Sequence, residues 1–187
     1  MTEAPRANFR SFQESTREDW ALIMSQIGKT QDMVADNALH LLRLLASDHG
    51  GFPVTRLEHS LQTATRAERD GRDAEYVVCA LLHDIGDTLA PFNHPYIAST
   101  MVKPFASEAN HFMVAQHGIF QGYYFWHHIG LDRNARDAFT DSPFYDYTEE
   151  FCAKYDSPAF DPDYKSAPLE HFEPLVRNFF ADKNRAA

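Results

Sequence analysis

Apolar residues recur at helical spacing over much of the chain. Val34, Ala38, Leu41 and Leu45 fall on one face of a helix that the pattern predicts from about residue 32 to 46. A second apolar stripe near the end of the chain is formed by Phe172, Leu175, Val176, Phe179 and Phe180. No segment alternates apolar and polar residues as a half-buried strand does, and no repeat appears. The pattern predicts an all-α fold, a single compact helical bundle.

Capping sequences predict where the helices begin. Ser15 and Thr55 each stand three residues before a glutamate, which is the pattern of a capping box. Asp73 and Ser107 are suitable N-cap residues, and Pro95 suits the first turn of a helix. These signals predict helices that begin near residues 16, 56, 74, 95 and 108, of which the first ends near residue 28. A further helical piece is predicted near residues 149–155.

The chain has 187 residues, enough to bury one sizeable core. We predict an N-terminal arm over residues 1–14 and one domain over residues 15–187 that ends in a C-terminal helical extension. The net charge of -10 argues against a nucleic acid or an anionic membrane as the main partner. A small anionic substrate remains compatible with it, because a local pocket can oppose the overall charge.

Cysteine usage and the N-terminus predict the compartment. Cys79 and Cys152 are too few to form a disulfide framework, which favours a reducing environment. The N-terminal residues lack an apolar signal core, and no stretch approaches the length of a membrane span. We therefore expect a cytoplasmic protein.

The stretch from Ala80 to Asp87 carries the clearest chemical signal. An apolar helical run leads directly into His83 and Asp84, and Gly86 follows. A buried imidazole and a buried carboxylate must be paired, hydrogen-bonded or bound to a metal. The chain also holds ten dispersed histidines, a weak indication of metal binding.

Six candidate metal ligands lie on or beside predicted helices: His59, His83, Asp84, His94, His117 and Asp156. Four imidazoles and two carboxylates can hold two divalent metals if Asp84 bridges them. Nitrogen and oxygen ligands without thiolate suit iron, manganese, cobalt or zinc. The alternative is a structural network of histidines and aspartates that binds no metal.

The stretch Leu57-Glu-His-Ser-Leu-Gln62, followed by Ala80-Leu-Leu-His-Asp-Ile-Gly86, resembles the HD-domain superfamily of metal-dependent phosphohydrolases and oxygenases. The resemblance is strongest to the oxygenase branch, which contains enzymes like 2-amino-1-hydroxyethylphosphonate dioxygenase and, more distantly, myo-inositol oxygenase. It extends over about residues 53–120. It implies an HD-domain helical bundle and a small-molecule substrate that reacts with dioxygen.

In that branch two irons, Fe(II) and Fe(III), share one carboxylate. The resemblance implies that the first iron is held by His59, His83, Asp84 and Asp156. It also implies that Asp84 takes part in catalysis and bridges to a second iron, held by His94 and His117. Asp156 has competitors nearby in the sequence: Asp146, Asp161 and Asp163.

The residues at the family's substrate-binding positions depart from its aminophosphonate enzymes. The resemblance places His49, Phe52, Asp87 and Gln121 there, with Asp87 in place of a histidine and Gln121 in place of a lysine. A cation for the phosphonate must then come from elsewhere, and the candidates are Arg56, Lys103, Arg133 and Lys154. Phe52 in place of an acid would fit a quaternary ammonium end, which aromatic faces bind.

The aromatic run over residues 123–126 is either part of such a cage or, as is more common, part of the core. His127 and His128 are either additional ligands or ordinary surface and core residues.

Three functions compete. The first is a non-haem di-iron oxygenase that cleaves a small hydroxylated substrate, a 1-hydroxyalkylphosphonate with or without a quaternary ammonium end, at its C–P bond. The second is a phosphohydrolase for a nucleotide or small phosphate ester, with Mn, Co or Zn and with Asp87 as general base. The third is a helical binding module without activity, against which the complete set of ligand residues argues.

Overall fold

The structure, a computed structural model, describes residues 5–47 and 50–181. Within these ranges the chain forms α-helices and short 3-10 or π turns and contains no strand, which confirms the all-α prediction. The helices are α1 (Arg17–Asp32), α2 (Val34–Leu44), α3 (Arg56–Arg69), α4 (Ala74–Leu82), α5 (His94–Val102), α6 (Glu108–Phe125), α7 (Tyr145–Phe151) and α8 (Leu169–Ala181). His49, a predicted substrate residue, lies outside the described residues.

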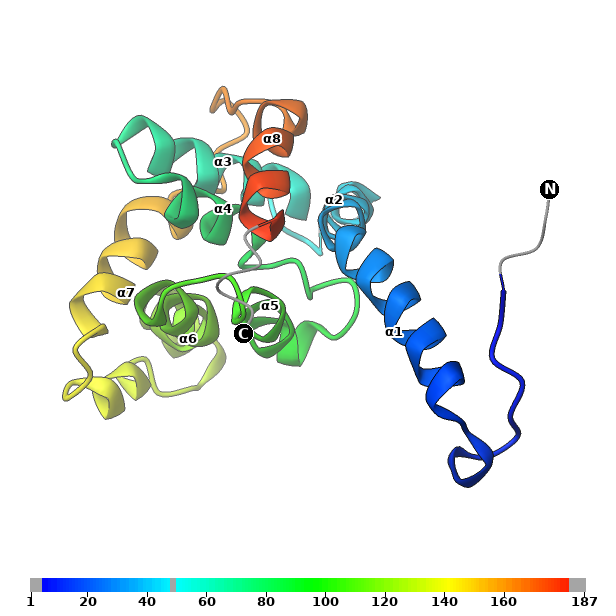
Figure 1. The fold of residues 1–187 in the computed structure, drawn as a ribbon. Helices are drawn as coiled ribbons and strands as arrows, with labels where there is room; N and C mark the ends of the chain where they lie inside the picture. The colour runs from blue at the N-terminus through cyan, green and yellow to red at the C-terminus, as the bar shows by residue number, and fades with distance from the viewer. Residues whose placement is uncertain (1–4, 48–49, 182–187) are drawn as a thin grey trace.

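Helix α4 lies at the centre of the fold. It packs against α3, α6 and α8, and every residue from Tyr76 to Leu82 is buried. A helix that is apolar on all sides is stable only when other elements cover it completely, which explains the unbroken apolar run before His83. Around it α5 packs on α6, and α2 packs on α8 (Figure 1). The predicted stripe of α8 faces this core with Phe172, Val176 and Phe180 buried.

Helix α1 leans away from the bundle and contacts α2 near its end (Figure 1). None of its described side chains is buried, and Trp20, Met24 and Ile27 leave an apolar stripe partly exposed. The division of the chain at residue 15 into an arm and a domain stays a prediction.

The predicted capping box at Ser15 is wrong by one residue. Ser15 Oγ donates to the carbonyl of Phe12 at 2.6 Å, in a short 3-10 turn (Phe12–Glu14), and so does not cap α1. Thr16 caps it instead: Thr16 Oγ1 accepts from Asp19 N–H at 3.1 Å, and Asp19 Oδ2 accepts from Thr16 N–H at 2.9 Å. The side-chain hydrogen bonds therefore identify Thr16, and not the adjacent Ser15, as the N-cap of α1.

Three predicted helix boundaries, one end and two starts, also differ from the structure. Helix α1 continues past Gly28 to Asp32, because a single glycine lowers helix stability without ending the helix. Helix α2 accordingly begins at Val34, and α7 begins at Tyr145 rather than near residue 149. The other predicted caps, those of α3, α4 and α6, are confirmed.

Cys79 and Cys152 are both buried and both unpaired. Across the described part of the chain, every helix is too short or too polar to cross a membrane.

Candidate metal centre

Helix α3 delivers His59 into the interior. Its first turn is fixed by a capping box, in which Thr55 Oγ1 accepts from Glu58 N–H at 3.1 Å and Glu58 Oε2 accepts from Thr55 N–H at 2.7 Å. His59 follows directly, and its exposed fraction is 2%. The cap therefore sets the direction in which the first candidate ligand points.

The end of α4 delivers His83 and Asp84. His83 is the C-cap residue of α4, so the chain leaves the helix inside the core rather than at the surface. A turn then leads to Gly86, where an added Cβ would lie 2.8 Å from the His94 carbonyl oxygen and 2.8 Å from Ile97 Cβ. This absence of a side chain lets the first turn of α5, with His94, approach Asp84.

The remaining candidates come from α6 and from a π-helical turn, Cys152–Asp156, that follows α7. His117 on α6 is buried. Ser157 N–H bonds to the Cys152 carbonyl at 2.9 Å, which adds one residue to the turn and brings Asp156 inward with an exposed fraction of 0%. Such π turns are uncommon and occur frequently at functional sites.

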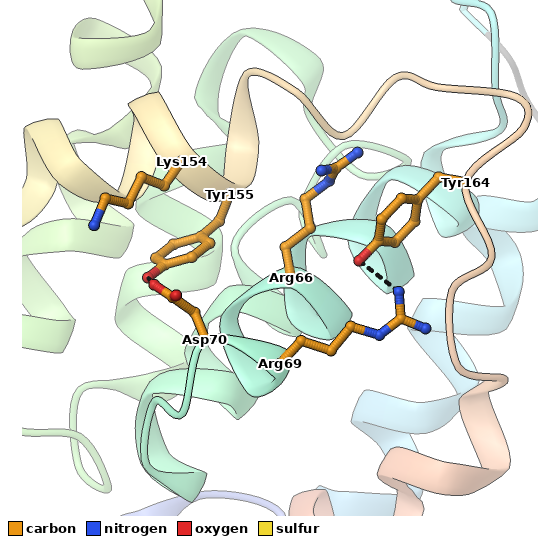
Figure 2. A pocket seen from close by; sticks show the side chains of 6 residues that line it. All are labelled: Arg66, Arg69, Asp70, Lys154, Tyr155 and Tyr164. Atoms are coloured by element: carbon orange, nitrogen blue, oxygen red, sulfur yellow. Dashed lines mark hydrogen bonds between the residues drawn. The ribbon is translucent and has the colours of Figure 1, made fainter.

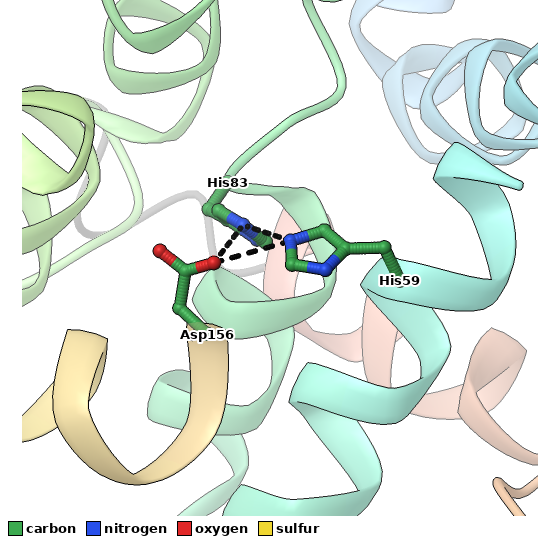
Figure 3. A group of neighbouring side chains, drawn as sticks. All are labelled: His59, His83 and Asp156. Atoms are coloured by element: carbon green, nitrogen blue, oxygen red, sulfur yellow. Dashed lines mark hydrogen bonds and ion pairs between the residues drawn. The ribbon is translucent and has the colours of Figure 1, made fainter. Parts of the chain in front are cut away.

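The first cluster, here called the inner group, consists of His59, His83, Asp84 Oδ2 and Asp156 Oδ1. Figure 3 shows three of these side chains pointing toward one another from separate elements. His59 Nε2 lies 3.1 Å from His83 Nε2, 3.4 Å from Asp84 Oδ2 and 3.2 Å from Asp156 Oδ1. His83 Nε2 lies 3.4 Å from the same Asp84 oxygen.

The second cluster, the outer group, uses the other oxygen of the same carboxylate. Asp84 Oδ1 lies 3.1 Å from His94 Nε2 and 3.0 Å from His117 Nε2. The two imidazole nitrogens are themselves 3.2 Å apart. Asp84 thus presents one oxygen to each group, which is the arrangement of a bridging carboxylate.

Each of the four imidazoles has its Nδ1 beside a main-chain carbonyl. The distances are 3.1 Å from His59 to Ala159, 2.7 Å from His83 to Ala80, 2.7 Å from His94 to Pro91 and 2.8 Å from His117 to Val114. A carbonyl accepts only, so this network assigns the proton to Nδ1 and a lone pair to Nε2. Four lone pairs and two carboxylates then converge, an arrangement that requires protons or cations to be stable.

Electrostatics favour cations at this cluster. Burial lowers the pKa of His83, but Asp84 and Asp156 outweigh it and raise that pKa to about 9. Burial likewise lowers the pKa of His94, while Asp84 and Asp87 raise it to about 10. The imidazoles in turn hold the pKa values of Asp84 and Asp156 below the ordinary range despite burial. The carboxylates are therefore ionised at neutral pH, and without metal they hold protons on His83 and His94.

The donor set fits metal ions. Bonds of about 2.1 Å at right angles separate neighbouring ligand atoms by about 3 Å, close to the spacings within both groups. Asp156 Oδ2 is buried without a hydrogen-bond partner, as an oxygen left for another ligand would be. The three sequence competitors of Asp156 are exposed at the surface: Asp146, Asp161 and Asp163.

Asp87 and Gln121 each contact a candidate ligand. Asp87 Oδ1 lies 3.0 Å from His94 Nδ1, and its other oxygen forms an ion pair with Arg56; its side chain is 3% exposed. Gln121 Nε2 donates to Asp156 Oδ1 at 2.7 Å. The sequence predicts that both residues bind substrate, and both line a cavity beside the outer group.

A cavity of about 470 Å³ adjoins the outer group. It is reached by Asp84 and by His94, whose side chain is 21% exposed. The other lining residues are Phe52, Arg56, Asp87, Pro91, Gln121, Tyr124, Phe125, Ser157 and Phe160. Its volume and its mixture of aromatic and charged side chains are those of a small-molecule site.

Two features of this cavity go beyond the sequence prediction. Arg56 is the one of the four predicted cations that lines it; Lys103, Arg133 and Lys154 do not. Phe160 stacks on His59 with ring centroids 4.3 Å apart. No sequence signal marks Phe160, because it lies in an irregular segment that approaches α3 from 101 positions away.

The remaining predicted side chains divide between cavity and surface. Tyr124 and Phe125 line the cavity, whereas Tyr123 packs against Arg136, whose guanidinium lies 3.7 Å from the ring centroid. His127 and His128 are exposed in the short 3-10 turn after α6 (Trp126–Ile129) and take no part in either group.

Residues 56–137 of the chain match the HD domain family. A 42-residue stretch is 55% identical to [1-hydroxy-2-(trimethylamino)ethyl]phosphonate dioxygenase (glycine-betaine-forming) of Leisingera caerulea. The match covers 22% of this chain and 21% of that enzyme. The chain is therefore similar to the HD domain family over residues 56–137 and, over a short stretch, to a phosphonate dioxygenase, as the sequence motifs predict.

Proposed function

We propose that this chain is a non-haem di-iron oxygenase that oxidatively cleaves a small 1-hydroxyalkylphosphonate at its C–P bond. The observation that carries the proposal is the division of the Asp84 carboxylate between two ligand groups. Two imidazole nitrogens lie beside each of its oxygens, so each oxygen has its own set of neighbouring candidate ligands. The similarity to a phosphonate dioxygenase, which extends over 42 residues, supports C–P bond cleavage as the reaction.

In this proposal the inner group holds one iron and the outer group holds the other, with Asp84 common to both. Imidazole and carboxylate ligands suit iron, manganese, cobalt and zinc alike, so the ligands alone do not select iron. When bound, an iron pair supplies the capacity to react with dioxygen and to bind the oxygens of the substrate. The main-chain carbonyls keep the four imidazoles oriented, and Gln121 holds the Asp156 carboxylate.

Arg56 is the proposed anion-binding side chain of the cavity. Asp87 holds it by an ion pair, and its guanidinium lies 5.0 Å from the centroid of the Phe52 ring. A guanidinium provides a fork of donors that matches phosphonate oxygens. Arg56 would therefore supply the positive charge that Asp87 and Gln121 do not.

The aromatic side chains offer a second contact, for a quaternary ammonium end of the substrate. Because Arg56 lies over Phe52 and Phe160 stacks on both His59 and Phe52, the faces left for such a cation belong to Tyr124 and Phe125. Cations bind aromatic faces within about 6 Å of the ring centroid. This contact is consistent with the trimethylamino group in the name of the similar enzyme.

The second candidate function is a phosphohydrolase for a nucleotide or small phosphate ester. Arg56 favours it as well, because a cation beside the metal centre steadies phosphate as readily as phosphonate. Asp87 is a poor general base in this role, since His94 and Arg56 already occupy its two oxygens. Manganese, cobalt or zinc would then replace iron.

Anaerobic iron loading distinguishes the two. The oxygenase proposal expects a mixed-valent di-iron EPR signal that changes on addition of a 1-hydroxyalkylphosphonate, and oxygen uptake when air is admitted. A His117→Ala variant serves as the control that lacks one ligand. Release of phosphate from nucleotides without consumption of oxygen would instead establish the phosphohydrolase.

A further inference from the structure

Gln62 closes the Leu57–Gln62 stretch that carries the family resemblance, yet it belongs to neither ligand group. Its side chain is 3% exposed and lies one helical turn after His59 on α3. Gln62 Nε2 donates to the Asp161 carbonyl at 2.8 Å, and Gln62 Oε1 accepts from Asp161 N–H at 3.3 Å. One buried amide thus satisfies both main-chain groups of a single distant residue.

The segment that Gln62 holds forms part of the metal centre. Residues 157–168, between the π turn and α8, contain no helix or strand, so those of their main-chain groups that no turn satisfies need other partners. The Ala159 carbonyl in this segment is the acceptor for His59 Nδ1. Phe160 stacks on the His59 ring with an interplanar angle of 20° and on Phe52 with centroids 5.2 Å apart. Asp161 follows directly, so Gln62 fixes the main chain beside both contacts.

Farther along, other side chains of α3 hold the same segment. Thr65 Oγ1 accepts from Ala167 N–H at 3.0 Å. Arg69 donates to Tyr164 Oη at 2.9 Å, and the Arg66 guanidinium lies 4.0 Å from the centroid of the same ring (Figure 2). These two arginines and Tyr164 line a depression of about 320 Å³. It shares no lining residue with the cavity that adjoins the outer group. Of these α3 side chains that bind the segment, Gln62 is therefore the nearest to His59 along the helix.

We propose that Gln62 is a positioning residue of the metal centre. By pairing with both main-chain groups of Asp161, it holds the Ala159 carbonyl on His59 Nδ1 and Phe160 across the His59 ring. The side chain then fixes the tautomer and orientation of His59 without touching a metal or a substrate. This inference rests on the proposed metal centre and not on the identity of the substrate.

The test compares Gln62→Met with Thr65→Val. Methionine keeps the length of the side chain and removes both bonds to Asp161, whereas valine keeps the shape of threonine and removes the bond to Ala167. Both variants loosen the same segment, and we expect both to lower the melting temperature. Residues that orient a ligating histidine typically change metal affinity by about 10- to 100-fold when replaced. We expect that loss for Gln62→Met and none for Thr65→Val.

Cobalt(II) titration of the metal-free proteins, followed by visible absorption, measures both affinity and ligand geometry. Gln62→Met should also alter the shape of the cobalt bands, because His59 loses its fixed orientation. Gln62→Glu, which keeps an acceptor for Asp161 N–H but has no donor for its carbonyl, gives a second variant if the first does not fold. It too should weaken cobalt binding.

Unchanged affinity and bands in both Gln62 variants would overturn the inference. So would an equal loss in Thr65→Val, since the effect would then follow from any loosening of the segment. Cobalt binding needs the metal ligands but no oxygenase reaction. A failure of the oxygenase proposal would therefore appear in the oxygen assay of the unsubstituted protein and not in this comparison.

Discussion

Asp84 differs from the other candidate ligands because each of its carboxylate oxygens contacts a different group of imidazoles. Replacing an imidazole removes one ligand from one group. Replacing Asp84 removes a ligand from both groups. The proposed centre therefore predicts the loss of one metal when an imidazole is replaced and the loss of both metals when Asp84 is replaced.

After anaerobic loading, His94→Ala and His117→Ala should each retain about one iron per chain fewer than the unsubstituted protein, and Asp84→Ala should retain neither. Metal analysis of desalted protein measures this directly. His40→Ala is the matched control, since His40 is exposed on α2. A His94→Ala protein that still holds two irons would contradict the assignment of the outer group.

Arg56→Gln tests the proposed anion contact. A lost hydrogen bond to a charged group costs about 1.5–3 kcal/mol, so binding of a phosphonate should weaken roughly 10- to 150-fold. Iron content should stay the same, because Arg56 reaches His94 only through Asp87. Titration of the iron-loaded protein with phosphonate, followed by EPR, provides the measurement.

The control for this substitution is Arg43→Gln, because Arg43 pairs with Glu173 on the surface at the α2–α8 contact. Equal phosphonate affinities in the two variants would remove Arg56 from the site.

At the scale of elements, the approach of α5 to the end of α4 depends on Gly86. An added methyl group there would overlap the main chain of His94 and the side chain of Ile97. Gly86→Ala should therefore displace α5, with a destabilisation of about 1–3 kcal/mol, as overpacking typically costs, and loss of metal from the outer group. Chemical denaturation and iron analysis measure the two effects.

Gly28→Ala is the control, because a methyl group at this exposed position in α1 meets nothing within 4 Å. A Gly86→Ala protein with full stability and two irons would show that α5 tolerates the shift.

The elements that sequence predicted well are those with strong local signals. The apolar run of α4 followed by His83-Asp84, the caps at Thr55, Asp73 and Ser107, and the stripe of α8 all depend on residues close together in the chain. A buried helix and its caps follow from such local patterns. This explains why the fold class could be predicted; the six candidate ligands lie close together in the structure, and their binding of metal stays a prediction.

Features that depend on distant contacts could not be predicted in the same way. The π turn that brings Asp156 inward is an extra residue in a helical turn, which apolar periodicity does not mark. The stacking of Phe160 on His59 and the pairing of Arg56 with Asp87 join residues far apart in sequence. The cap at Thr16 was missed because the adjacent Ser15 offers the same chemistry.

For the molecule as a whole, the proposed centre joins five elements: α3, the end of α4, α5, α6 and the π turn after α7. A ligand that binds the folded chain and not the unfolded chain stabilises it by mass action. At a free metal concentration 100 times the dissociation constant, the gain is about 2.7 kcal/mol. Metal should therefore act on the stability of the entire bundle.

We expect the melting temperature to rise when iron or cobalt is added without oxygen, and to fall when a chelator removes the metal. Differential scanning fluorimetry under nitrogen provides the measurement. Asp84→Ala should show no such rise. If neither metal nor chelator changes the melting temperature of the unsubstituted protein, the proposal that one metal centre joins these elements is contradicted.

The sharing of Asp84 has one more consequence, for how the two proposed irons would bind. When a single carboxylate serves two sites, occupancy of either site changes the free energy of binding at the other. Thermodynamic linkage requires this change to be reciprocal: the factor by which the inner iron alters the affinity of the outer one equals the factor in the opposite direction. Metal titrations of this protein should therefore follow two coupled constants, and a half-loaded sample should not behave as half of a fully loaded one.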